Sequence, residues 1–167
     1  MNILITGGAG FIGSTLGEFL LEQGETVIGY DNFDAFYPAA VKRSNIEGLM
    51  KHKAFRMVEG DINDTSRLTE VFSSTNIDMV VHLAAKAGVR PSIMNPRAYE
   101  QVNVAGTINL LEVMKSFGVS NLVFASSSSI YGNNEKIPYS ETDNVDFPIS
   151  PYAATKKAGE LFTYNYH

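Results

Sequence analysis

The stretch "ILITGGAGFIG", at residues 3–13, constrains the fold of this chain more than any other feature. Gly8, Gly10 and Gly13 give the spacing G-x-G-x-x-G directly after an apolar run, and Gly7 adds a second, overlapping spacing. Glycines let a backbone turn sharply and approach a pyrophosphate, while the following helix N-terminus offers free N–H groups to the phosphates. Because the pattern joins a predicted strand to a predicted helix, it favours a dinucleotide-binding loop over a glycine-rich turn without a ligand. No Gly-Lys-Ser/Thr follows, which excludes a P-loop.

Short apolar runs alternate with longer amphipathic stretches along the chain. The apolar runs predict strands at residues 2–6, 26–30, 54–58, 78–83 and 121–126, and runs that are apolar throughout are typical of strands covered on both faces. The amphipathic stretches predict helices at residues 11–23, 38–51, 65–75, 96–117 and 151–167. Strands alternating with helices indicate an α/β fold, a Rossmann-type doubly wound parallel sheet with right-handed crossovers.

Two of the predicted helices carry further signals. In the first helix, one stripe holds Ile12, Leu16, Phe19 and Leu20, which we expect to face the sheet. The helix from Pro96 is apolar on more than one face, so we expect it to pack on the sheet and also on another partner, such as a second subunit; its apolar residues are Val102, Val104, Ile108, Leu111, Val113 and Met114. Asn95-Pro96 and Ser150-Pro151 each place a capping residue before a proline at the first helical position.

Composition excludes several classes of protein. The 167 residues are 44% hydrophobic and 19% charged, which is typical of a folded globular chain. The net charge of −5 and the scattered basic residues argue against nucleic-acid or anionic-membrane binding. There is no cysteine, no apolar run long enough to span a membrane, and no signal peptide after Met1, so we expect a cytoplasmic protein. His82 is expected in the core, and His52 and His167 lack partners at metal spacing, so no metal site is predicted.

Asp31 ends the second predicted strand, about twenty residues beyond the glycines, where a carboxylate can accept hydrogen bonds from the adenosine ribose. The same carboxylate would repel a 2′-phosphate, at a cost on the order of 4 kcal/mol for a partly solvated contact, so NAD is favoured over NADP. Taken alone, Asp31 could equally begin a loop. Asp61, after the third predicted strand, lies where an adenine amino group could be met, which is a weak indication by itself.

Tyr152 and Lys156 lie four residues apart on the last predicted helix, so they share one face. A nearby ammonium favours the phenolate form of a tyrosine, and such a pair can act as a general base. The spacing by itself is common on protein surfaces. Its position after a dinucleotide loop and after the fifth predicted strand favours a catalytic pair. That strand ends in "FASSSSIYG", and its serines at residues 126–129 form either a polar turn or a set of hydroxyls for a substrate oxygen.

These motifs occur in the order found in the extended short-chain dehydrogenase/reductases, of the NAD-dependent epimerase/dehydratase type. The segments "TGGAGFIG", "HLAAKAGVR", "NPRAYEQVNVAGTINLLE", "ASSSSIYG" and "DNVDFPISPYAATKKAGEL" extend the resemblance to nearly the whole chain. The chain is most similar to the UDP-glucuronate 4-epimerases. The resemblance implies an NAD-dependent isomerase that acts on a UDP-sugar, with transient oxidation at C4 and return of the hydride to the opposite face. It also implies a homodimer through the helices that begin at Pro96 and Pro151.

The resemblance also implies roles for single residues. Tyr152 would be the base, Lys156 would hold the nicotinamide ribose, and Ser127 would bind the sugar 4-oxygen. Arg90 and Ser128 would face the substrate. The cofactor would be bound, besides Tyr152 and Lys156, by Gly7, Gly10, Phe11, Ile12, Gly13, Asp31, Asn32, Lys42, Asp61, Ile62, Leu83, Ala84, Ala85, Lys86, Asn103 and Ala125. Lys86 stands where a glutamine is expected, which leaves its role open.

Related enzymes dehydrate or decarboxylate the sugar and carry a carboxyl group in the two positions after the serine equivalent to Ser127. Ser128 and Ser129 occupy these positions here, which favours epimerisation. Members of the family continue into a smaller substrate domain, so residues 1–167 are expected to be a partial NAD-binding Rossmann domain that is inactive alone. The alternatives are another NAD-dependent nucleotide-sugar epimerase or dehydratase, such as a UDP-glucose 4-epimerase, or a non-catalytic NAD-binding module.

Overall fold

The structure, a computed structural model, describes residues 1–36 and 38–167. These residues form two compact units. The first unit comprises residues 1–84 and 109–125, and the second comprises residues 85–108 and 126–167. The first unit holds the sheet and the glycine loop, whereas the second holds Ser127, Tyr152 and Lys156.

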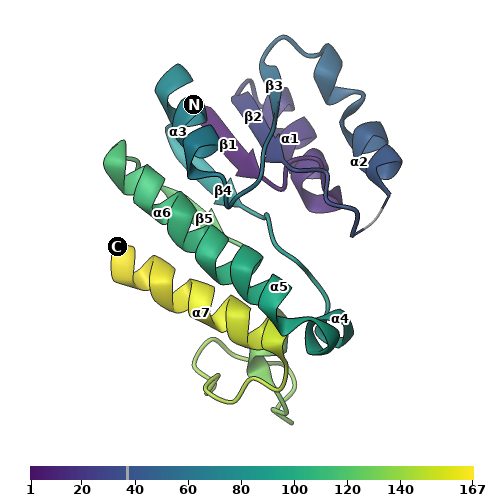
Figure 1. Ribbon diagram of the computed structural model, residues 1–167, viewed down its shortest axis with the longest axis vertical. Helices are drawn as coiled ribbons and strands as arrows, with labels where there is room; N and C mark the ends of the chain where they lie inside the picture. The colour runs from purple at the N-terminus through teal and green to yellow at the C-terminus, as the bar shows by residue number, and fades with distance from the viewer. Residues whose placement is uncertain (37) are drawn as a thin grey trace. The chain divides into compact units, whose positions relative to one another are not determined.

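The sheet of the first unit contains five parallel strands, and all five predicted strands are confirmed (Figure 1). They are β1 (Asn2–Thr6), β2 (Thr26–Asp31), β3 (Phe55–Glu59), β4 (Met79–His82) and β5 (Leu122–Phe124). β1 lies at the centre, where Ile5 pairs with Gly29 of β2 and Thr6 pairs with His82 of β4.

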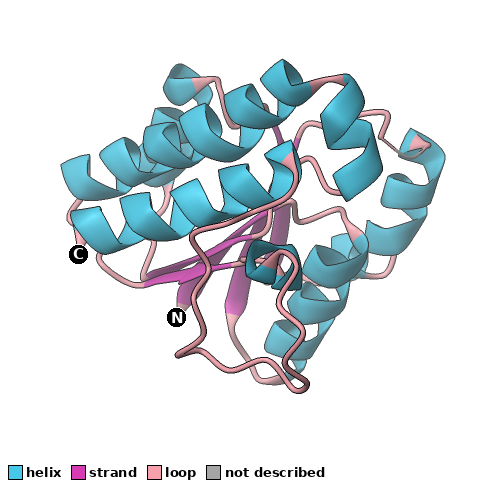
Figure 2. Cartoon of the chain, turned by 90° about the horizontal axis from the view of Figure 1, so that it is seen from below, coloured by secondary structure: helices cyan, strands magenta, loops and turns pink. Residues whose placement is uncertain are grey.

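The strand order β3-β2-β1-β4-β5 makes the sheet doubly wound, as predicted. The chain moves outward from β1 to β3 and then returns past β1 to β4. Right-handed crossovers therefore place α1 (Phe11–Glu22) and α2 (Ala39–Ile46) on one face, and α3 (Thr65–Ser74) on the other face with the part of α6 (Gly106–Ser116) that belongs to this unit. Figure 2 shows helices on both sides of the strands. The winding reverses between β1 and β4, and their carboxyl ends form the crevice where such sheets bind ligands.

Burial differs between the central strands and the end strands. β1, β2 and β4 are almost completely buried, but β3 and β5 are partly exposed, and Val123 of β5 is 51% exposed. The prediction that all five strands are covered on both faces is therefore wrong for β3 and β5. Both lie at the ends of the sheet, where the flanking helices of this unit cover less of the strand.

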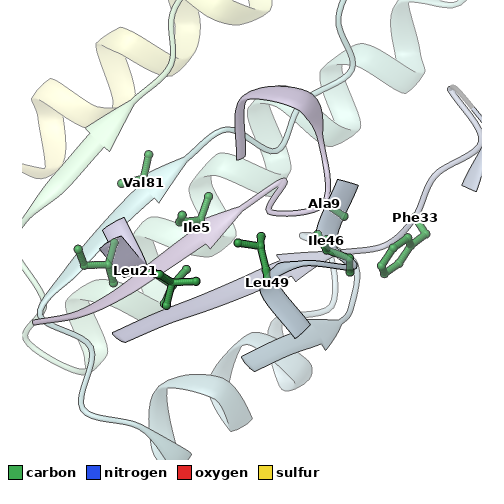
Figure 3. Packing of buried hydrophobic residues seen from close by; sticks show 9 residues of the cluster. Ile5, Ala9, Leu21, Phe33, Ile46, Leu49 and Val81 are labelled. Carbon is green, nitrogen blue, oxygen red and sulfur yellow. The ribbon is translucent and has the colours of Figure 1, made fainter. Parts of the chain in front are cut away.

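One apolar cluster of the first unit includes Leu21 of α1 and Ile46 of α2, and Figure 3 shows its side chains. α1 turns Gly13, Ser14, Gly17 and Leu21 toward it. The predicted apolar stripe of this helix is wrong for Ile12 and Phe19, because both are mostly exposed. The helix approaches its neighbours most closely at its start: a Cβ atom added to Gly13 would lie 2.3 Å from the carbonyl oxygen of Gly7, whereas one added to Gly17 would be in ordinary van der Waals contact with Leu49.

Two predicted helices have different bounds in the structure. The helix predicted at residues 38–51 is α2 (Ala39–Ile46) followed by a 3-10 turn, η1 (Leu49–Lys51). Gly48 separates the two pieces, and glycine is a weak helix former. The helix predicted at residues 96–117 consists of α5 (Pro96–Glu100), a π-helical turn η2 (Gln101–Ala105) and α6.

The second unit is built around α7 (Pro151–Tyr166), which packs against α5, η2, a short helix α4 (Val89–Met94) and a 3-10 turn η3 (Ser128–Tyr131). α4 was not predicted. Both predicted caps are confirmed, since Asn95 accepts a hydrogen bond from the N–H of Ala98 and Ser150 accepts one from that of Ala153.

The predicted apolar residues of the segment 96–117 are buried or half-buried in the described chain. Leu111, Val113 and Met114 are buried in the first unit, and Val102, Val104 and Ile108 are half-buried in the second. The part of the expectation for this segment that concerns a second subunit stays a prediction. Among the described residues, no helix is both long and apolar enough to cross a lipid bilayer.

Candidate functional site

The glycine loop after β1 is a tight turn whose backbone bonds are made locally. The N–H groups of Gly7 and Gly8 donate to the carbonyl of Tyr30 at 2.7 and 3.3 Å, and that of Gly10 donates to the carbonyl of Gly7 at 3.0 Å. A Cβ atom on Gly13 would lie 2.3 Å from the carbonyl oxygen of Gly7, so no side chain fits there. Gly7 has φ +72°, and a Cβ atom on it would lie 2.9 Å from the backbone nitrogen of Ala84. Glycine is required at both positions.

The N-terminus of α1 presents its backbone N–H groups without a side-chain cap. Gly10 is the N-cap residue, no side chain accepts a hydrogen bond there, and the first turn contains no acidic residue. Phe11 and Ile12, which open the helix, are exposed. An uncapped helix N-terminus carries a partial positive charge, so the cradle of Gly7, Gly10 and Gly13 fits the phosphates of a dinucleotide.

Asp31, at the end of β2, forms a buried ion pair with Lys42 of α2. The Lys42 Nζ atom lies 2.9 Å from Oδ1 of Asp31, and both side chains are less than a tenth exposed. Oδ1 also accepts the N–H of Phe33 at 2.8 Å, and Oδ2 accepts the N–H of Ala9, within the glycine loop, at 3.2 Å. The structure therefore brings Asp31, Lys42 and the glycine loop together, as a cofactor site requires. The same contacts hold the loop in place.

The loop after β3 brings Asn32 and Asp61 together. Nδ2 of Asn32 donates to Oδ2 of Asp61 at 2.7 Å, while Oδ1 of Asp61 accepts the backbone N–H and the side-chain amide of Asn63. The hydroxyl of Tyr30 donates to the carbonyl of Asp61 at 2.8 Å. The Asp61 side chain thus orders its own loop, and an adenine contact for it stays a prediction. Ile62, next in the chain, is buried.

The ends of β4 and β5 supply the remaining predicted residues of the first unit. Leu83 donates its N–H to the carbonyl of Thr6, and Ala125 donates to the carbonyl of His82. Ala84 is half-buried and donates its N–H to the Thr6 hydroxyl at 3.2 Å. His82 is confirmed as a core residue, since it is 2% exposed and its Nδ1 lies 2.6 Å from that hydroxyl.

In the second unit, Tyr152 and Lys156 lie on α7, one turn apart. Lys156 is 5% exposed, and burial lowers the pKa of its ammonium group to about 8. Tyr152 is half-buried, and its ring meets the ring of Tyr99 edge to face, with 6.2 Å between the centroids. The Tyr99 hydroxyl donates to the carbonyl of Ala87 at 2.6 Å, and burial, with a smaller effect from Tyr152, raises the pKa of Tyr99. Tyr99 therefore fixes the position of the Tyr152 ring.

Asn103, predicted to line the cofactor, is 2% exposed, and its amide is engaged within the unit. Its Oδ1 accepts the N–H of Lys86 at 2.7 Å, and its Nδ2 donates to the Lys86 carbonyl and to the Thr155 hydroxyl, both at 3.0 Å. Asn103 lies in the π-helical turn η2, a feature often found at functional sites. It ties the segment containing Ala85 and Lys86 to α7, and a direct cofactor contact stays a prediction.

The serines after β5 form a hydrogen-bonded turn. The Ser127 hydroxyl lies 2.9 Å from that of Ser129 and accepts the N–H of Ser129 at 3.2 Å. Ser126 donates to Oε1 of Glu160 at 2.5 Å, and Lys157 donates to Oε2 of the same carboxylate at 3.1 Å. The turn that carries Ser127 is therefore attached to α7. The other two predicted substrate residues, Ser128 and Arg90, are exposed and lie on η3 and α4.

Sequence reasoning missed three residues that hold this site: Tyr99, Thr155 and Glu160. Glu160 could have been found, because it follows Lys156 by four residues and so shares its helix face. Tyr99 and Thr155 act through a ring contact and a hydrogen bond across helices, which spacing does not encode. In the part of the chain that the structure describes, no three His, Asp or Glu side chains are grouped to hold a metal ion.

Known proteins resemble this chain over nearly its whole length. The family sequence profile described as GDP-mannose 4,6 dehydratase matches residues 4–167. The UDP-glucuronate 4-epimerase of Thermodesulfobacterium geofontis is 48% identical over 164 residues, which cover 98% of this chain and 50% of that protein.

Solved structures give the same result. The UDP-glucuronic acid 4-epimerase from Bacillus cereus, in complex with UDP-glucuronic acid and NAD, is 38% identical with a TM-score of 0.90, over 100% of this chain and 52% of that one. The UDP-glucose 4-epimerase from Bifidobacterium longum, in complex with NAD+ and UDP, is 32% identical with a TM-score of 0.90, over 100% and 49%. The chain thus spans about half the length of these relatives.

The buried ammonium of Lys156 predicts a pH-dependent stability. Its pKa is about 8 in the folded chain against 10.5 as the ordinary value, so the unfolded chain binds more protons between these values. The free energy of unfolding should therefore rise with pH over this range, by up to about 3 kcal/mol from this group. Urea unfolding of the wild type and of Lys156→Met across this range measures the difference. A difference that does not change with pH would contradict a desolvated ammonium.

Proposed function

Since the chain belongs to the GDP-mannose 4,6 dehydratase family, we propose that it carries the NAD-binding and catalytic residues of a nucleotide-sugar 4-epimerase that interconverts UDP-glucuronate and UDP-galacturonate. The observation that carries this proposal is the buried Lys156 one turn after Tyr152, in a chain whose β1–α1 loop is shaped for a dinucleotide. The proposed substrate is taken from two relatives. The Thermodesulfobacterium geofontis protein, at 48% identity, and the Bacillus cereus protein are both named as 4-epimerases of UDP-glucuronate.

The side chains of the second unit have distinct roles in this proposal. Tyr152 takes the proton from the sugar 4-hydroxyl and later returns it. Lys156, one turn further along the same helix face, would hold the nicotinamide ribose. Ser127 binds the 4-oxygen, and Ser129 and Glu160 hold the turn that positions it. Oxidation and reduction at C4 need a hydride acceptor and donor, which is the chemistry that NAD supplies when bound.

Epimerisation is favoured over dehydration because the Ser127 turn offers no free acid. Ser127 is bonded to Ser129, and the neighbouring positions carry only hydroxyl groups. The nearest carboxylate in this network belongs to Glu160, and both its oxygens are used, by Ser126 and Lys157. Removal of a C5 proton with loss of the C6 hydroxyl needs carboxyl groups that this turn does not provide.

Each of the two units carries some of the residues proposed to bind the cofactor. In the first unit, the glycine loop with Phe11 and Ile12 would hold the pyrophosphate, and Asp31 with Asn32, Lys42, Asp61 and Ile62 would hold the adenosine. Leu83, Ala84 and Ala125 would lie along the strand ends. In the second unit, the proposed contacts are Ala85, Lys86, Asn103, Tyr152 and Lys156, and Arg90 and Ser128 would face the substrate.

The identity of the cofactor can be tested by calorimetry. NAD is expected to bind at least tenfold more tightly than NADP, because a 2′-phosphate would approach the buried carboxylate of Asp31. Asp31→Asn keeps the shape and removes the charge, so it should narrow this preference. NADP binding equal to or tighter than NAD binding in the wild type would contradict the proposal.

The reaction can be tested by turnover of UDP-glucuronate, with UDP-galacturonate detected by NMR. We expect interconversion by the full product of the gene, and a loss of at least 100-fold in kcat in Tyr152→Phe, which lacks the general base. Residues 1–167 alone should be almost inactive if the nucleotide is held elsewhere in the protein. A 4-keto-6-deoxy sugar or a pentose as product would contradict the argument from Ser128 and Ser129.

We also propose a cytoplasmic homodimer in which α7 contributes to the interface. Leu161 and Tyr164 of this helix are 59% and 84% exposed, and exposed apolar side chains that lie together favour association. Light scattering at micromolar concentration should then give about twice the chain mass of 18.3 kDa, and Leu161→Glu should lower it. The mass of a single chain in the wild type would contradict the dimer.

A further inference from the structure

Helix α2 contacts the glycine loop through a residue that has no assigned role, Asn45. Its Nδ2 donates to the carbonyl oxygen of Ala9 at 3.1 Å. Ala9 lies between Gly8 and Gly10, is fully buried, and donates its own N–H to Asp31 at 3.2 Å. Ala9 is therefore held through both of its backbone polar groups, once from β2 and once from α2.

This contact fixes the peptide that leads into the phosphate cradle. The peptide group between Ala9 and Gly10 has its oxygen bonded to Asn45 and its N–H bonded to the carbonyl of Gly7 at 3.0 Å. Both the oxygen and the N–H of this peptide are thus hydrogen-bonded, although Gly10 on its C-terminal side would otherwise ease its rotation. The next backbone N–H groups along the chain open α1, and their direction follows from the orientation of this peptide.

Asn45 is well anchored for such a role. Ile46, next in the helix, is buried beside Ala9 and Phe33 in the core cluster (Figure 3). The guanidinium carbon of Arg43 lies 4.6 Å from the centre of the Phe33 ring, and Lys42 binds Asp31. Four residues of α2, namely Lys42, Arg43, Asn45 and Ile46, therefore contact the loop or its supports, and the Asn45 side chain is held against Ala9.

We propose that Asn45 is a positioning residue for the pyrophosphate half of the dinucleotide site. It aligns the Ala9–Gly10 peptide before the ligand arrives, so that phosphate binding does not have to order the loop. This inference rests on the proposed function, because it takes the β1–α1 loop as the dinucleotide site. A merely structural role, in which Asn45 only holds α2 in place, would affect all parts of the ligand site equally.

The test compares Asn45→Ala with the control Ser44→Ala in the complete protein. Both substitutions raise helix propensity in α2. Ser44 is exposed, whereas Asn45 donates to Ala9, so Asn45→Ala removes this hydrogen bond and Ser44→Ala keeps it. Affinities for NAD, ADP and adenosine are measured by calorimetry or NMR. In Asn45→Ala we expect NAD and ADP to bind about three- to tenfold more weakly, the effect of one lost hydrogen bond, and adenosine to change by less than about twofold. Ser44→Ala should match the wild type.

Equal weakening of all three ligands, or no change in ADP affinity, would overturn the proposal. If the wild type binds none of these ligands, the proposed cofactor is wrong, and hydrogen exchange then decides about Asn45 separately. The amides of Gly10–Gly13 should exchange faster in Asn45→Ala than in Ser44→Ala without any ligand. Unchanged exchange would show that Asn45 does not orient the loop.

Discussion

The contact on which the rest of the first unit depends is the approach of Gly13 to the carbonyl of Gly7. With no room for a Cβ atom, the first turn of α1 lies directly against the loop that leaves β1. This closeness sets the path of α1 across the sheet, and the buried residues in the first half of the helix are small, namely Gly13, Ser14 and Gly17, with Leu21 buried further along. The helix N-terminus stays uncapped, because loop residues 7–10 are glycine or alanine and have no side chain that accepts a hydrogen bond.

Polar contacts complete what this backbone contact begins. Asp31, Lys42 and Asn45 come from β2 and α2, and they enclose the loop from the side opposite β4. The carboxylate of Asp31 is costly to bury, and the ammonium of Lys42 together with two backbone N–H groups offsets that cost. In the second unit, Asn103 and Glu160 act similarly: each joins a loop that holds predicted site residues to α7.

Sequence patterns predicted the sheet and the two helix caps, because both depend on local residue types, and the location of the proposed chemistry stays a prediction. Gly8 and Gly13 identify the loop since a Cβ atom fits at neither position, and the spacing of Tyr152 and Lys156 follows from helix geometry. The π-helical turn around Asn103 and the short helix α4 were not predictable, because they result from packing within the second unit. The exposure of Val123 depends on strand order, and the ring contact between Tyr99 and Tyr152 depends on distances between helices.

The chemical type of each supporting contact has a consequence for how such a chain can diverge during evolution. Asp31 with Lys42, and Ser126 with Glu160, are bonds between two side chains, so a replacement at one position alters what the other tolerates. Relatives that lose one member of such a pair should show a compensating replacement at the other. Asn45 donates to the backbone carbonyl of Ala9, which is present whatever side chain stands at residue 9. Selection on this hydrogen bond therefore acts on residue 45 alone. If residue 45 changes, no side-chain replacement at residue 9 restores the lost hydrogen bond.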